Sequence, residues 1–105
     1  MSASSASPSP AERRRVAAVE IVFYEGAGCG LCARALELLE SEAPRLGFEF
    51  RRVAIDGDDE LERRHRIDLP VVVIDGEIAF TQAVAAGPLR RAVRRAQARR
   101  EEASS

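Results

Sequence analysis

The chain has 105 residues, which is enough for one small domain with a single hydrophobic core. Hydrophobic residues make up 46% and charged residues 31% of the sequence, the balance of an ordinary globular protein. Sixteen basic residues against seventeen acidic ones leave a net charge of -1, and Trp is absent, so neither a basic field nor a base-stacking surface indicates a nucleic-acid partner.

The two ends of the chain have a different composition from its middle. Residues 1–16 are rich in Ser, Ala and Pro and end in basic residues, which reverses the order of a secretory signal. No stretch is apolar for long enough to cross a membrane. We therefore predict a disordered tail over residues 1–16, a folded domain over residues 17–98, a second tail over residues 99–105, and a cytoplasmic protein.

The first predicted elements are a strand and a helix. Val19–Glu25 is almost continuously apolar and β-branched, which favours a strand buried on both faces. Gly26–Gly28 interrupts it, and from Cys29 the apolar period becomes helical until Pro44 and Gly47 end the run. The residues at helical spacing are Cys32, Ala35, Leu36, Leu39 and Ala43.

A second strand and a short helix are expected next. Phe48–Ile55 carries alternating apolar residues whose phase slips once, which indicates a bulge or an irregular edge. Residues 56–65 place acidic side chains at the start and basic ones at the end, as the helix dipole favours. We interpret the acids as helix caps and His65, near the helix end, as a solvated residue.

The last predicted elements are a hairpin and a helix. Leu69–Phe80 contains an Asp-Gly turn at Asp75–Gly76 between two apolar runs, which predicts a β-hairpin. Gly87-Pro88 opens a helix with one apolar face, and we interpret its six Arg as a solvated face. The apolar residues of this helix are Leu89, Ala92, Val93 and Ala96. The order is β-α-β-α-β-β-α, which predicts an α/β fold with a four-stranded mixed sheet and flanking helices.

The two cysteines of the chain, Cys29 and Cys32, fall at the start of the first predicted helix. Free backbone N–H groups and the helix dipole stabilise a thiolate at Cys29 and lower its pKa. Cys32 follows one turn later, close enough to react with the first sulfur. A structural pair, a zinc site completed by His65 in a dimer, and an iron–sulfur cluster shared between chains remain alternatives.

Three segments of the chain form a recognisable set: "IVFYEGAGCGLCARALELL", "VAIDGDDEL" and "RIDLPVVVIDGE". With these segments the chain resembles small bacterial glutaredoxin-like proteins of the thioredoxin superfamily, over roughly residues 19–98. It implies a thioredoxin-like fold and a glutaredoxin-like thiol–disulfide oxidoreductase, in which Cys29 is the nucleophile and Cys32 the resolving thiol. It also implies that Pro70 is a cis-proline facing the C-x-x-C, and that the backbone of Leu69 binds the partner chain or glutathione.

The predicted substrates are protein or low-molecular-weight disulfides, handled by a monomer that needs no metal and no organic cofactor. Glutathione is a candidate co-substrate, and Arg66 is the candidate side chain for one of its carboxylates. Asp68 lies near the substrate groove that Pro70 is expected to shape, and it would repel that carboxylate. We therefore expect weak activity with glutathione and better reduction by a dithiol donor. The alternative function is a catalytically weak protein-binding module with the same fold.

Overall fold

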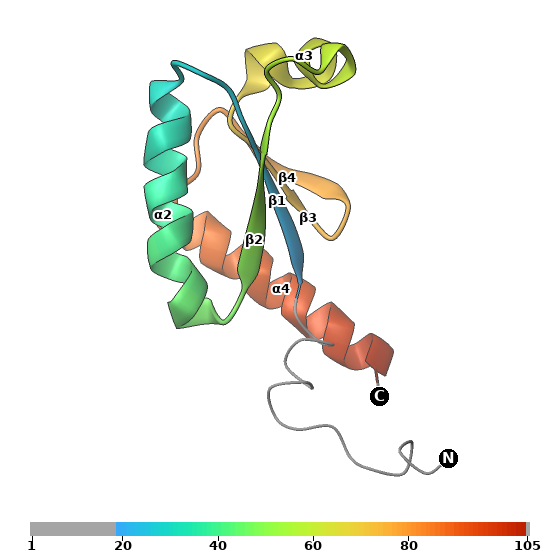
Figure 1. Cartoon of the computed structure of the whole chain (residues 1–105). Coiled ribbons are helices and arrows are strands. Elements are labelled where there is room, and N and C mark those ends of the chain that lie inside the picture. Colours follow the sequence, from blue (N-terminus) through green and yellow to red (C-terminus); the bar gives the residue numbers. More distant parts are fainter. Residues whose placement is uncertain (1–18, 105) are drawn as a thin grey trace, which may run out of the picture.

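The computed structural model describes residues 19–104 (Figure 1). The tail predicted over residues 1–16 lies outside the described residues. The elements follow the predicted order, with one short 3-10 helix, η2, added after the second α-helix. They are β1 Glu20–Glu25, α2 Gly30–Leu46, β2 Glu49–Ala54, α3 Asp59–His65, η2 Arg66–Asp68, β3 Val71–Ile74, β4 Glu77–Thr81 and α4 Ala86–Ser104.

The four strands form one mixed sheet in the order β2-β1-β3-β4. β1 pairs in parallel with β2, across the connection made by α2, and antiparallel with β3. The predicted hairpin is confirmed, because β3 and β4 pair antiparallel through a turn in which Asp75 and Gly76 have φ values of 51° and 85°. Positive φ at both central residues is the geometry of a two-residue hairpin turn, and Asp-Gly suits it.

The register shift lies in the hairpin and not in β2. The β1–β2 pairing is continuous, whereas the pairing of β3 with β4 shifts between Val72 and Val73. The phase slip along Phe48–Ile55 has another cause. The ring of Phe50 contacts the buried Phe23 on one face of the sheet. Val53 instead pairs with Tyr24 and so lies on the other face.

The main core lies between one face of the sheet and the helices α2 and α4, which pack against each other (Figure 1). Phe23 and Val72 are cross-strand neighbours on this face, and both are fully buried. The other face is covered at one end by α3, whose His65 stacks on Tyr24. The residues that form the main core are Val19, Ile21, Phe23, Cys32, Ala35, Leu39, Phe48, Val72, Ile74, Leu89, Val93 and Ala96.

Of the two residues predicted to end helix α2, the helix continues through Pro44 to Leu46, and Gly47 is its C-cap at φ 80°. Proline interrupts a helix mainly through its missing N–H and its clash with the preceding turn. Here Pro44 is in the last turn and exposed, and the N–H groups of Gly47 and Phe48 both donate to the carbonyl of Ala43. The left-handed glycine, not the proline, therefore ends this helix.

Helix α4 runs to Ser104, through residues that the sequence analysis assigned to a tail beginning at residue 99. The guanidinium of Arg100 donates to the carboxylate of Asp75, with a shortest distance of 2.7 Å, so the last turns are held against the hairpin. Composition alone did not reveal this partner, which lies 25 residues earlier in the chain. Across residues 19–104, no helix combines the length and the apolar character that a membrane span requires.

Candidate functional site

The C-x-x-C pair lies at the junction of β1 and α2, as predicted. Cys29 is the N-cap of α2, in an extended conformation, and its Sγ accepts a hydrogen bond from the backbone N–H of Cys32 at 3.1 Å. Gly28 turns the chain into the helix with φ 70°, a conformation that favours glycine. An N-cap sulfur receives N–H groups that have no partner within the helix, and this arrangement stabilises a thiolate.

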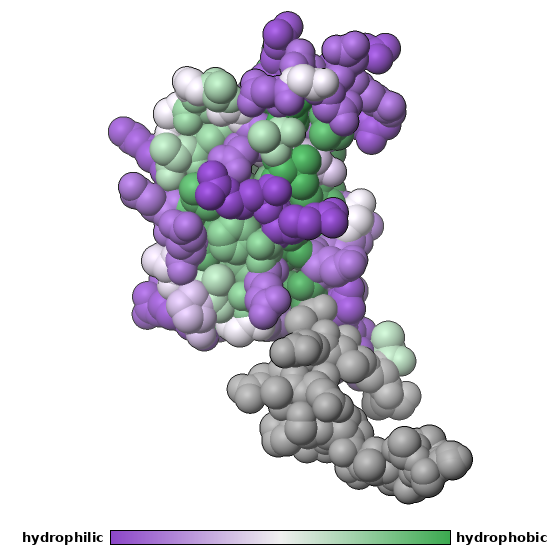
Figure 2. Space-filling model, viewed as in Figure 1, coloured by the Kyte–Doolittle hydropathy of each residue, from purple (hydrophilic) through white to green (hydrophobic). Residues whose placement is uncertain are grey.

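Cys29 and Cys32 are joined by a disulfide, with their Cα atoms 5.2 Å apart. Cys29 is half-buried, whereas Cys32 is only 3% exposed and belongs to the core. The surface over the start of α2 is pale on the hydropathy scale, beside the strongly hydrophilic surface of α3 (Figure 2). The pair therefore has one sulfur within reach of a partner and one sulfur held inside.

The segment with Leu69 and Pro70 lies beside the loop that leads to Cys29. The Leu69–Pro70 peptide bond is cis, which confirms the sequence prediction. A Cβ placed on Gly26 would lie 2.7 Å from Cδ1 of Leu69, closer than real contacts allow. Gly26 therefore permits the close approach of Leu69, and the structure brings together these two segments as the resemblance implied.

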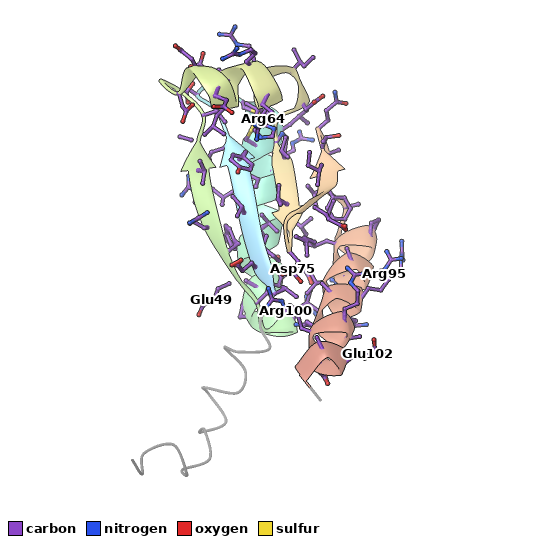
Figure 3. The ribbon with its side chains drawn as sticks, turned by 90° about the vertical axis from the view of Figure 1, so that its right-hand side faces the viewer. Glu49, Arg64, Asp75, Arg95, Arg100 and Glu102 are labelled. Carbon is purple, nitrogen blue, oxygen red and sulfur yellow. A yellow bond between two sulfur atoms is a disulfide. The ribbon has the colours of Figure 1, made fainter. Side chains whose placement is uncertain are left out.

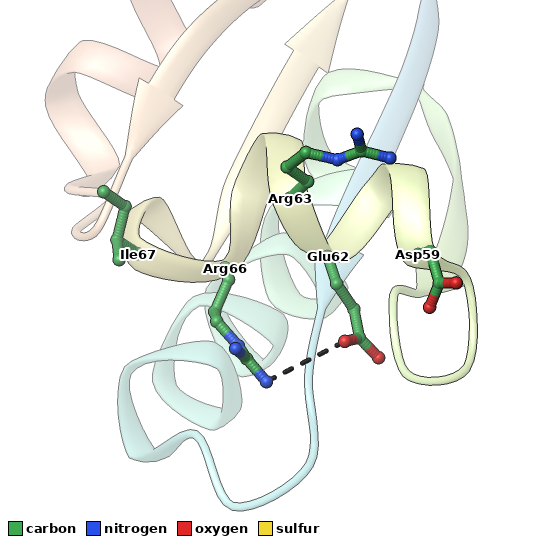
Figure 4. Close-up of a pocket in the computed structure, with 5 residues that line it drawn as sticks. All are labelled: Asp59, Glu62, Arg63, Arg66 and Ile67. Atoms are coloured by element: carbon green, nitrogen blue, oxygen red, sulfur yellow. Dashed lines mark ion pairs between the residues drawn. The ribbon is translucent and has the colours of Figure 1, made fainter.

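Arg66, the candidate side chain for a glutathione carboxylate, lies in η2, directly after α3. It lines a pocket of about 330 Å³ on α3 and η2, together with Asp59, Glu62, Arg63 and Ile67 (Figure 4). Arg66 forms an ion pair with Glu62 at 3.8 Å, and neither cysteine lines this pocket. Ile67 is 84% exposed. The pocket is therefore lined by two basic side chains, two acidic side chains and one exposed apolar side chain.

The interpretation of His65 as a solvated residue is wrong. Its side chain is buried, and its ring stacks on Tyr24 with centroids 4.5 Å apart and an interplanar angle of 28°. Burial lowers the pKa of His65 below its ordinary value, the charge of Arg64 lowers it further, and Asp68 opposes the shift. The neutral ring thus forms part of the packing behind the end of β1.

Two of the Arg residues on α4 are structural partners and not a solvated face. Arg90 binds the carboxylate of Glu42 with two hydrogen bonds of 2.9 and 2.8 Å. Arg100 binds Asp75, and Figure 3 shows these two residues side by side. These guanidinium groups lower the pKa values of Glu42 and Asp75. Glu42 is 3% exposed. Sequence reasoning missed it, although it lies three residues after the core residue Leu39.

Asp56 and Asp58, two acids in the turn between β2 and α3, have separate partners. Asp58 is the N-cap of α3, and its carboxylate accepts the N–H groups of Glu60 and Leu61, as the capping interpretation predicted. Asp56 instead accepts the N–H of Ala27, two residues before Cys29, at 3.0 Å. Within residues 19–104, no group of three or more His, Cys, Asp or Glu side chains is arranged to hold a metal ion.

Known protein structures share the architecture of this chain. A solution structure of protein Ne2328 from Nitrosomonas europaea has 20% identity and a TM-score of 0.63, covering 72% of this chain and 92% of that chain. An X-ray structure of target protein XcR50 from X. campestris has 27% identity and a TM-score of 0.62, with coverage of 71% and 96%. Thioredoxin from Fasciola hepatica has 20% identity and a TM-score of 0.57, with coverage of 79% and 85%.

No curated protein sequence matches the chain. The model of the family described as glutaredoxin-like domain (DUF836) matches residues 20–94, from β1 into α4. This match includes both cysteines, the cis-proline segment and the hairpin, and it spans more than half of the chain. The chain therefore belongs to the glutaredoxin-like domain family and has a thioredoxin-like fold.

Proposed function

We propose that the protein is a thiol–disulfide oxidoreductase that reduces protein or low-molecular-weight disulfides through Cys29 and Cys32. Membership of the glutaredoxin-like family and the C-x-x-C pair support a role in thiol redox chemistry. The observation that carries the proposal is the position of the pair. Cys29 is the N-cap of α2 and the more accessible sulfur, and Cys32 is buried within bonding distance of it.

The proposed reaction has two exchange steps. In the reduced protein, the thiolate of Cys29 attacks one sulfur of the substrate disulfide, a mixed disulfide forms, and the other substrate sulfur leaves as a thiolate that takes a proton from water. Cys32 then loses its proton to water and attacks Sγ of Cys29, which releases the second substrate thiol. The substrate gains two electrons, and the protein loses two as the Cys29–Cys32 disulfide forms.

We propose that Leu69 and Pro70 shape the surface that receives the substrate, because the Leu69 side chain packs directly on the loop before Cys29. A substrate chain that lies along this segment would present its disulfide to the more accessible sulfur. The cytoplasmic monomer expected from the sequence suits this role, since the reducing cytosol keeps a C-x-x-C pair available for turnover.

We propose a dithiol, rather than glutathione, as the reductant that returns Cys29 and Cys32 to the thiol state. Glutathione carries two carboxylates, and the candidate side chain for one of them, Arg66, is already paired with Glu62 in a pocket that also contains Asp59. These acids repel a carboxylate that approaches Arg66. A dithiol donor needs no such recognition, because its second thiol completes the exchange.

The test measures turnover of a small disulfide with glutathione and, in parallel, with a dithiol donor, for the wild type and for Cys29→Ser, Cys32→Ser and Arg66→Ala. We expect turnover with the dithiol, its loss in Cys29→Ser, and a trapped mixed disulfide in Cys32→Ser. Turnover with glutathione that disappears in Arg66→Ala would overturn the choice of reductant. Absence of turnover with either donor would favour the protein-binding module instead.

A further inference from the structure

We propose that Asp56 is a positioning residue that holds the loop carrying Cys29 in place for thiol–disulfide exchange. Its Oδ2 atom accepts the backbone N–H of Ala27 at 3.0 Å, and the two residues are 29 positions apart in the chain. This inference rests on the proposed function of Cys29, and it assigns a role to a side chain that the exchange steps do not otherwise use.

The loop Gly26–Gly28 has few other restraints. The pairing of the strands ends just before it, where the N–H of Ile55 donates to the carbonyl of Glu25 at 2.9 Å. Gly26 has no side chain and packs on Leu69, while Ala27 and Gly28 are exposed. The Asp56 carboxylate is therefore the side-chain partner that fixes the backbone of this loop two residues before Cys29.

Asp56 is itself held by an ordered turn. The N–H of Asp58 donates to the carbonyl of Ile55 at 3.1 Å, and the N–H of Gly57 donates to the carboxylate of Glu62 at 2.9 Å. Gly57 has φ 88°, which lets the chain turn sharply between β2 and α3. The turn thus holds the Asp56 carboxylate next to the N–H of Ala27.

The bond links the three parts of the site. Asp56 fixes the loop from the β2 side, Leu69 packs on Gly26 from the cis-proline side, and Cys29 follows as the helix N-cap. The rate of thiol–disulfide exchange falls steeply when the attacking sulfur is not held in line with the disulfide bond. Releasing Ala27 should therefore slow exchange at Cys29 more than it weakens the fold, because the Asp56 side chain is exposed and outside the core.

The experiment compares the full-length wild type with Asp56→Ala and Asp56→Asn. The asparagine keeps an oxygen that accepts the Ala27 N–H but removes the negative charge, so it separates the hydrogen bond from the electrostatic effect. Asp58→Ala serves as the matched control, because it removes the N-cap of α3 in the same turn and leaves the partner of Ala27 in place. Thermal unfolding is recorded first, so that each rate is measured on folded protein.

Two quantities are measured on each protein: hydrogen exchange of the Ala27 amide, and the rate constant of the reduced protein with a small disulfide. In Asp56→Ala, we expect faster Ala27 exchange and a rate constant lower by roughly three- to tenfold, the range for one hydrogen bond at an exposed site. We expect Asp56→Asn and Asp58→Ala to keep the wild-type rate constant within about twofold.

The outcomes separate this inference from the proposed function. Asp56→Ala with wild-type rates and wild-type Ala27 exchange would overturn the positioning role. If Asp56→Asn reacts as slowly as Asp56→Ala, the effect on the rate constant comes from charge and not from the hydrogen bond. If Asp58→Ala reacts equally slowly, the effect comes from a general loss of stability. Either result also overturns the positioning role. A wild type that does not react with any disulfide refutes the proposed function, while Ala27 exchange still decides whether Asp56 holds the loop.

Discussion

Helix α4 and the loop before Cys29 are held by different kinds of interaction. At the end away from the cysteines, Arg90 and Arg100 each grip a carboxylate through two nitrogen atoms, with shortest distances of 2.8 and 2.7 Å to Glu42 and Asp75. At the C-x-x-C end, the bidentate pair of Arg52 with Glu25 joins β2 to β1, whereas the loop before Cys29 is held by one bond from Ala27 to Asp56 and by the packing of Leu69 on Gly26. Bidentate arginine–carboxylate pairs are among the stronger hydrogen-bonded contacts in proteins.

This difference fits the disulfide exchange that we propose for Cys29. The Glu42–Arg90 pair joins α2 to α4, and the Asp75–Arg100 pair joins the hairpin to the last turns of α4, so both fix whole elements. A loop held by single contacts opens at lower cost, and sites that receive partners are drawn from such regions. The molecule therefore has a rigid end that fixes the helices and a more adjustable end that carries Cys29.

The largest effect on stability is expected from breaking the rigid end at Glu42. Glu42→Ala leaves the guanidinium of Arg90 without its bidentate partner and opens space at a site that is 3% exposed in the wild type. We expect the melting temperature to fall by roughly 5 to 10 °C, while the rate constant of Cys29 with a small disulfide stays unchanged. Glu40→Ala, an exposed position on the same helix, is the control.

The same substitution also tests an acid dependence. Arg90 lowers the pKa of Glu42 below 4.5, so the contribution of the pair is complete above about 4.5 and is lost as the pH falls through the lower, folded value. Glu42→Ala should therefore lose less stability than the wild type in this acidic range. Equal losses in the two proteins, or a slower exchange at Cys29 in the variant, would contradict the separation of the two ends.

The fold was largely predictable because its signals are local. The period change at Cys29 marked the start of α2, and the Asp-Gly pair marked the hairpin. The burial of Glu42 was not predictable from composition, since its partner Arg90 comes 48 residues later. The extent of α4 was missed for the same reason, because Asp75 becomes a partner of Arg100 only when the hairpin folds against the helix.

The candidate site was likewise predictable only in part. The positions of Cys29 and Cys32 followed from the strand-to-helix transition, and the cis bond before Pro70 followed from the family resemblance. Arg66 was chosen because it lies near the end of the second predicted helix, and the sequence did not reveal that it lines a pocket together with Glu62. Asp56 was interpreted with the other acids as a cap, and its actual partner, Ala27, is on a loop that sequence patterns do not position.

A smaller effect is expected at the adjustable end, from Gly26→Ala compared with Gly30→Ala. The new Cβ at position 26 would lie 2.7 Å from Cδ1 of Leu69, so the Leu69 side chain must move, whereas nothing lies within 4 Å at position 30. We expect Gly26→Ala to cost about 1 kcal/mol in the free energy of unfolding, the low end for overpacking, because a flexible side chain can yield. Gly30→Ala, on the first turn of α2, should stabilise by up to about 1 kcal/mol.

Urea unfolding of the oxidised proteins measures both changes, and exchange with a protein disulfide reports on Leu69. Slower exchange in Gly26→Ala is expected, since the displaced Leu69 is part of the proposed substrate surface. If both alanines were tolerated equally in stability and in rate, the contact between Gly26 and Leu69 would not define this end of the molecule.

The smallest effect is expected from His65→Phe, and it concerns how each end responds to pH. His65 is buried against Tyr24 at the C-x-x-C end of β1, and burial lowers its pKa below the ordinary value of 6.5. The folded state then binds fewer protons than the unfolded state, so the stability contributed by the neutral ring is complete above about 6.5 and is lost as the pH falls through the folded value. Phenylalanine keeps an aromatic ring on Tyr24 and cannot titrate.

We therefore expect the melting temperature of the wild type to fall more than that of His65→Phe between about pH 7.5 and about pH 5.5, a range in which the Glu42–Arg90 pair stays ionised. In the wild type, the protection of the Tyr24 amide against hydrogen exchange, measured relative to its intrinsic rate at each pH, should fall over this range before that of Ala92 in α4, because acid weakens the adjustable end first. Parallel melting curves for the two proteins would show that His65 does not titrate with folding. Equal loss of protection at the two amides would show that the ends do not respond separately.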